Sequence, residues 1–174
     1  MSNYYTLKAL YRVGVLNEES FFAMLNGFFY KRYVSDPGVG SMSMTDGNEK
    51  HDHWGLVYSG GLFAGISQDI IIRNATNNKH SLDDMMRGLF SDLGGTNQSY
   101  TLENLQNRLT DLSGEDQSDF FETYIVGSRK VPLDEYLKKS GLHSEIKLDN
   151  LSVLRQKGES PQEEEMIQGL LGAN

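Results

Sequence analysis

The sequence predicts an all-α fold, a multi-helix array of six or seven helices with two long loops and a weakly ordered C-terminal tail. Apolar residues recur at the three- and four-residue spacing of a helix face through most of the 174 residues. Turn residues and residues typical of helix ends separate these stretches. With 38% apolar residues, nine tyrosines and eight phenylalanines, the composition is that of a globular protein with a real core.

The first two helices are expected at residues 3–13 and from Asn17 to about Tyr33. Gly14 is a natural C-cap for the first helix, and the Asn17 side chain offers an acceptor to the free amides that begin the second. Their apolar faces comprise Tyr4, Leu7, Leu10 and Tyr11 in the first and Phe21, Leu25, Phe28 and Phe29 in the second.

A long loop and then a third helix are expected next. Residues 34–50 carry turn residues without periodicity, and a loop of this length is often functional. Helical spacing returns near Trp54 and continues through the apolar set that ends at Ile70–Ile72. This triplet alone would also fit a buried strand, but we favour a helix because the spacing begins well before it.

The remaining helices are recognised by their starts and stops. Ser81 and Asp84 form a capping-box pattern, Thr101 is suited to cap the next helix, and Pro132 suits a first helical turn. We expect three stripes in one core: Phe21/Leu25/Phe28, Leu62/Ile66/Ile70 and Leu105/Leu109/Leu112.

Two regions are expected along the chain, a helical subdomain over 1–142 and a tail over 143–174. In the tail, alternation between Ile146 and Val153 allows a short strand, and the last apolar residues fit a terminal amphipathic turn.

Composition excludes several functions. The formal net charge of −8 argues against nucleic-acid binding, which needs a basic surface. The absence of cysteine excludes disulfides, thiolate zinc sites and cysteine nucleophiles. No uninterrupted apolar stretch predicts a membrane span, and no secretory signal follows Met1. The default compartment is cytoplasmic, although a fragment of a longer protein would carry any signal upstream; the oligomeric state is not predicted.

Residues able to carry chemistry are few. The chain lacks a His-Glu-x-x-His helix, and no metal ligand set or cofactor is predicted on it. His51 and His53 would make a weak metal site at best, and we favour a solvated loop. The pair Asp83–Asp84 is interpreted as helix-start chemistry rather than acid–base catalysis, with Arg73 as a structural ion partner.

Several segments, read in order, resemble the C-terminal half of the glycyl aminopeptidase family of gluzincin zinc metallopeptidases. The matching stretches are Tyr4–Tyr5, 9–14, 21–29, 36–38, Tyr58–Gly61, Gln68–Arg73, Ser81–Arg87, Tyr100–Glu103, 119–127, 131–137 and Gly141–Leu142. They cover about residues 4–142.

The resemblance implies a helical domain that covers one side of a peptide-binding cleft. In the family, zinc is held by a His-Glu-x-x-His helix and a further Glu, in a segment that ends close to the pair matched by Tyr4–Tyr5. This chain would therefore be inactive alone, with the N-terminal zinc domain as its partner and peptides as substrates of the whole protein. Tyr58 is similar to the gluzincin tyrosine that donates its hydroxyl to the oxyanion, although Gly60 stands where the family has Lys.

Two alternatives stay open beside this interpretation. The chain could be a free-standing helical protein-interaction module derived from the same fold, or an independent hydrolase that uses carboxylates or His51 and His53. A reading frame that continues upstream into a His-Glu-x-x-His helix would distinguish the first interpretation from the module.

Overall fold

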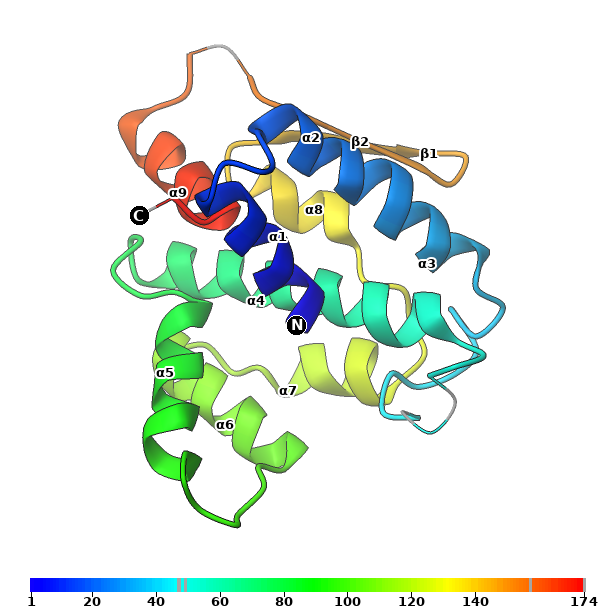
Figure 1. Cartoon of the computed structure of the whole chain (residues 1–174), viewed down its shortest axis with the longest axis vertical. Coiled ribbons are helices and arrows are strands. Elements are labelled where there is room, and N and C mark those ends of the chain that lie inside the picture. Colours follow the sequence, from blue (N-terminus) through cyan, green and yellow to red (C-terminus); the bar gives the residue numbers. More distant parts are fainter. Residues whose placement is uncertain (47, 49, 157, 174) are drawn as a thin grey trace.

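The computed structural model describes residues 1–46, 48, 50–156 and 158–173. The chain is mostly helical and adds one small antiparallel sheet of two strands, so the strictly all-α prediction is wrong. The helices surround a central helix, and the strands lie at one edge of the molecule (Figure 1).

The N-terminal helices follow the predicted starts and stops. Helix α1 spans Ser2–Arg12, and α2 (Glu18–Ala23), η1 (Met24–Tyr30) and α3 (Lys31–Ser35) run on without a break. A reciprocal capping box between Asn17 and Ser20 starts α2, and Glu18 and Glu19 complement the helix dipole there. The segment η1 is a π-helix, which the sequence did not predict.

The central helix is formed by η3 (Gly55–Ser59), a second π-helical segment, and α4 (Gly60–Ala75). Helix α4 contacts α1, α5, α6, α8 and α9 and is buried on nearly all sides, which explains why most of its residues are apolar. By length and composition Gly55–Ala75 would suffice to cross a membrane, but 78% of its apolar window is buried inside the protein. Burial in the core therefore accounts for its hydropathy, and Ile70–Ile72 are helical.

The next helices form an extension and return to the core. Helices α5 (Leu82–Leu93) and α6 (Leu102–Ser113) form a hairpin that projects from the body (Figure 1), followed by α7 (Ser118–Phe120), η4 (Phe121–Val126, π-helical) and α8 (Leu133–Lys138). Capping boxes at Ser81 and Thr101 start α5 and α6, and Gly114 ends α6 in the left-handed conformation.

The C-terminal segment is part of the fold rather than the weakly ordered tail that we expected. Strands β1 (His143–Lys147) and β2 (Asn150–Leu154) pair antiparallel, with Ile146 opposite Leu151. Positive φ angles at Leu148 (46°) and Asp149 (60°) form the tight turn between them. Helix α9 (Pro161–Leu171) packs against α1 and α4 and buries Met166, Ile167, Leu170 and Leu171.

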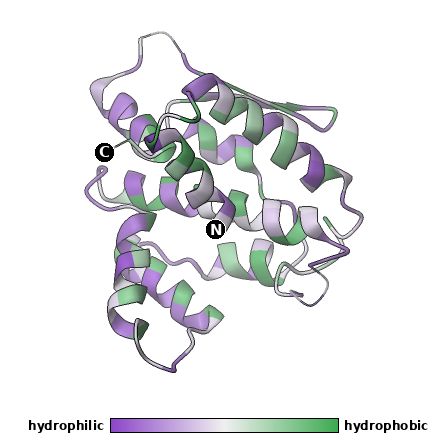
Figure 2. Ribbon diagram, viewed as in Figure 1, coloured by the Kyte–Doolittle hydropathy of each residue, from purple (hydrophilic) through white to green (hydrophobic). Residues whose placement is uncertain are grey.

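One continuous core contains most of the predicted stripes. Hydrophobic and hydrophilic residues share most helices (Figure 2), and the apolar ones in the core come from α1 through α9. Leu112 is only half-buried, and Phe28 is 38% exposed, so the stripe that was expected to end at Phe28 ends at Phe29 instead. The i→i+5 bonding of η1 rotates the following side chains, which places Phe29 in the core and Phe28 on the surface.

Candidate functional site

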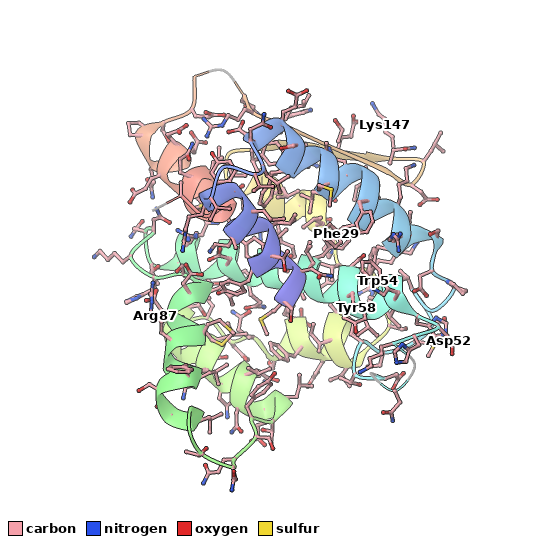
Figure 3. All side chains as sticks on the ribbon, viewed as in Figure 1. Phe29, Asp52, Trp54, Tyr58, Arg87 and Lys147 are labelled. Carbon is pink, nitrogen blue, oxygen red and sulfur yellow. The ribbon has the colours of Figure 1, made fainter. Side chains whose placement is uncertain are left out.

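Tyr58 lies in an aromatic cluster, formed by Phe28, Phe29, Trp54 and Tyr58. Trp54 stacks on Tyr58 with ring centroids 5.3 Å apart and on Phe29 at 6.2 Å. Phe28 meets Trp54 edge-on at 5.9 Å. Figure 3 shows Phe29, Trp54 and Tyr58 together on adjoining helices. Tyr58 is 36% exposed, so its ring is supported from one side while part of it reaches solvent.

Two π-helical segments bring this cluster together. Phe28 and Phe29 belong to η1, whereas Tyr58 belongs to η3, and the two segments contact each other. Helix α3, which continues η1, comes close to η3 because Gly55 has no side chain: a Cβ there would lie 2.1 Å from the Arg32 carbonyl oxygen. Short π-helical segments occur frequently at functional sites, and this is the part of the fold where two of them meet.

A guanidinium lies against the outer face of the aromatic cluster. Arg32 Cζ is 4.3 Å from the centroid of the Phe28 ring and 5.0 Å from that of Trp54. The exposed position and the two rings make this a cation–π contact that holds the Arg32 side chain over the cluster.

Asp36 connects the loop after α3 to the start of the central helix. Its carboxylate accepts hydrogen bonds from the Leu56 N–H at 3.0 Å and the Gly38 N–H at 2.9 Å, and lies 2.9 Å from His53 Nδ1. Burial alone would raise the pKa of Asp36, but the hydrogen bonds from His53, Leu56 and Gly38 outweigh it and lower the pKa below 3.8. The carboxylate thus supplies the cap that the first turn of this helix needs.

The two histidines of the sequence pattern have different surroundings. His53 is engaged with Asp36 and partly buried, whereas His51 is exposed in the preceding loop. Within the described residues, no group of three His, Asp or Glu side chains is arranged to hold a metal ion.

The acidic pair at the start of α5 takes part in structural contacts. Asp83 lies 2.9 Å from Lys8 Nζ, and Asp84 accepts a hydrogen bond from the Ser81 N–H at 2.9 Å. Burial acts to raise the pKa of Asp83, but the Lys8 ammonium and hydrogen bond lower it overall. Neither carboxylate is left free for the acid–base role that the hydrolase alternative would require.

Arg73 pairs with a carboxylate that the sequence interpretation did not single out. Its Nε lies 3.1 Å from Asp69 Oδ1 on the same helix, and its Nη1 donates to Asn78. Asp69 is fully buried and also accepts from the Leu82 N–H and the Tyr4 hydroxyl, at 2.9 and 2.7 Å. The sequence could have indicated this ionic centre, because Asp69 and Arg73 are oppositely charged, lie four residues apart and are flanked by apolar residues of the same helix.

Comparison with known proteins adds no assignment. No family model matches the chain, and no curated protein matches it either.

Proposed function

We propose that this chain is the C-terminal helical domain of a zinc-dependent aminopeptidase-like protein. In this role it covers one side of a peptide-binding cleft, and the zinc and its ligands belong to a separate N-terminal domain. The chain alone is inactive because it has neither the His-Glu-x-x-His helix nor the general-base Glu.

The position of Tyr58 carries this proposal. The residue lies near the start of the central helix, partly exposed, with its ring held by Trp54. A phenol held in this way can donate to a developing oxyanion on a substrate that lies outside the domain's own core. Because the helix below it is locked in the core, the hydroxyl is placed without reorganisation during the reaction.

An exposed apolar groove supports the covering role. The groove between α1, α5 and α6 has a volume of about 890 Å³ and is lined in part by Met86, Phe90 and Tyr100. These three side chains are 38%, 79% and 56% exposed. An apolar surface of this kind typically marks a protein interface, and the zinc domain is the occupant that the proposal supplies.

The test uses the whole protein that joins this domain to a zinc domain. Changing Tyr58→Phe removes one oxyanion donor and should lower kcat about a hundred- to a thousandfold, with KM little changed. The control is Tyr136→Phe, which removes a phenol hydroxyl on α8, outside both the aromatic cluster and the groove, and should leave kcat unchanged. Turnover of the Tyr58→Phe enzyme within a factor of a few of the parent would remove Tyr58 from the mechanism.

The same groove also favours the second candidate, a helical protein-interaction module without peptidase activity. The two candidates differ in their coding sequence. Continuation of the reading frame upstream into a His-Glu-x-x-His helix supports the peptidase domain, and a natural start at Met1 supports the module.

A further inference from the structure

An open pocket lies at the start of the central helix, next to the aromatic cluster. It has a volume of about 230 Å³ and is lined by Arg32 of α3 and by Asp52 and Trp54 from the segment that leads into η3. Figure 3 shows Asp52 and Trp54 at the same end of the central helix. The pocket therefore brings together a positive and a negative side chain from two separate segments of the chain.

The two opposite charges in this pocket do not neutralise each other. Arg32 and Asp52 are both exposed, and among the described residues neither side chain takes part in a salt bridge or a hydrogen bond. Asp36 also lines the pocket, but two backbone N–H groups and His53 already engage its carboxylate. Within the described part of the chain, the pocket thus offers a ligand an unpaired guanidinium and an unpaired carboxylate.

The Arg32 side chain is positioned before any ligand arrives. Its Cζ lies 4.3 Å from the centroid of the Phe28 ring and 5.0 Å from that of Trp54. A guanidinium forms hydrogen bonds in its own plane, so contact with aromatic rings leaves its N–H donors available. Two of these donors match the two oxygens of a carboxylate. Because the stacking already restricts the side chain, less conformational entropy is lost on binding.

We propose that this pocket binds the zwitterion of a free α-amino acid. The ligand carboxylate pairs with Arg32, the ligand ammonium pairs with Asp52, and the ligand side chain packs beside Trp54. The volume is sufficient, because a cavity of about 150 Å³ already accommodates benzene. The inference does not depend on the zinc aminopeptidase proposal, since it involves only residues of this chain and needs no catalytic activity.

The first experiment titrates the full chain with L-leucine and follows tryptophan fluorescence. The signal reports on this pocket because Trp54 is the single tryptophan of the sequence. Leucine should give a saturable change with a Kd in the millimolar range, since both protein charges are exposed to water. N-acetylleucine lacks the ammonium and leucinamide lacks the carboxylate, so each should bind about five- to tenfold more weakly. Equal Kd values for the three compounds overturn the proposal, as does the absence of a saturable change.

Two variants assign each charge of the ligand to its partner. Arg32→Gln should bind leucine and leucinamide equally, and Asp52→Asn should bind leucine and N-acetylleucine equally, because each variant lacks the charge that distinguishes the two compounds. Both positions are exposed, so folding should not change. The control Lys31→Gln removes a neighbouring positive charge that contacts Asn150 outside the pocket, and its Kd values should equal those of the wild type. A preference that survives in either variant contradicts the pairing proposed for that charge.

Two further measurements locate the ligand and identify its source. Leucine should shift the backbone amide NMR signals of residues 32–38 and 52–56, and shifts centred elsewhere in the chain overturn the proposal. The two ends of a short peptide carry the same charges farther apart, as in the dipeptide leucylglycine. Binding of leucine at least as tightly as leucylglycine supports a free amino acid as the ligand. Tighter binding of the dipeptide overturns this assignment and makes the pocket a site for peptide ends.

Discussion

Asp69 joins several buried polar groups in one ionic centre. Its fully buried carboxylate accepts from Arg73, from the Leu82 N–H and from the Tyr4 hydroxyl, and Lys8 Nζ lies 3.8 Å away. Burial and the negative charge of Asp69 together raise the pKa of Tyr4, so the phenol stays a donor. The core tolerates the negative charge of Asp69 because hydrogen-bond donors and positively charged side chains surround its carboxylate.

Replacing Asp69 by Asn should therefore be severely destabilising. The Lys8 and Arg73 side chains, 3% and 7% exposed, would keep their charges in the core without this carboxylate. Breaking a buried ion pair from one side costs about 3–5 kcal/mol, which urea unfolding would measure. The control Asp92→Asn removes an exposed partner of Arg108 and should cost no more than about 1 kcal/mol. Equal costs for the two variants would contradict the central role of Asp69.

The lowered pKa of Asp36 predicts that the free energy of unfolding depends on pH. Its pKa is lowered in the folded state, so its contribution is fully present above the ordinary value of 3.8 and is lost as the pH falls through the lower, folded value. The wild-type chain should exceed Asp36→Asn in free energy of unfolding at pH 6, and the excess should shrink once the pH falls below about 4. Chemical unfolding of both proteins between pH 6 and pH 2.5 provides the measurement. An excess that stays constant over this range would show that the Asp36 hydrogen bonds do not favour the ionised form.

At the scale of elements, the helix starts were predicted correctly where residues close in sequence determine them. Asn17, Ser81 and Thr101 all cap their helices as predicted, and all three caps are reciprocal, which the spacing had indicated only for Ser81 with Asp84. The π-helical segments were not predicted, because their register depends on packing between η1 and η3 rather than on a local pattern. The strands and α9 were underestimated because their burial requires partners distant in sequence, such as α1 and α4 for α9.

The candidate site shows the same limit. Tyr58 was singled out only through a family resemblance, since a single tyrosine at a helix start carries no local signal of its own. Trp54 stacks between Phe29 of η1 and Tyr58 of η3, which are far apart in sequence. The sequence of neither segment alone predicts this contact. His53 was noted as a metal ligand candidate, but its partner Asp36 lies 17 residues earlier, across the loop.

Two helical glycines, one packed between α9 and α4 and one on the surface of η1, should respond in opposite ways to a methyl group. A Cβ at Gly169 would lie 2.3 Å from Arg73 Nη1, and Asp69 and Asn78 hold that guanidinium in place. Gly169→Ala should destabilise by about 1–3 kcal/mol despite the better helix propensity of alanine. At Gly27 a Cβ meets nothing within 4 Å, so Gly27→Ala should stabilise by up to about 1 kcal/mol. Thermal unfolding of both variants measures the signs, and stabilisation by Gly169→Ala would mean that α9 does not approach Arg73 this closely.

At the scale of the whole molecule, exposed apolar side chains gather on the α5–α6 side. Phe90, Met86 and Tyr100 line the groove together with the buried Leu105. The β-turn with Leu148 lies at the opposite end of the molecule from α5 (Figure 1). Docking of the zinc domain on the α5–α6 face is the part of the proposed function that a surface variant can test.

Phe90→Asp should separate docking on this face from folding. The side chain is 79% exposed, so the variant should change the free energy of unfolding of the isolated chain by no more than about 0.5 kcal/mol. If the groove is the docking face, a charge at its exposed aromatic residue should raise the Kd for a separately expressed zinc domain at least tenfold, because such aromatics dominate interface energies. The control Leu148→Asp places the same charge in the turn between β1 and β2, at a side chain that is 95% exposed. The Kd of this variant for the zinc domain should equal that of the wild type. Calorimetric titration of the three proteins compares these values directly. An unchanged Kd for Phe90→Asp would assign docking to another surface and leave the groove to a different partner.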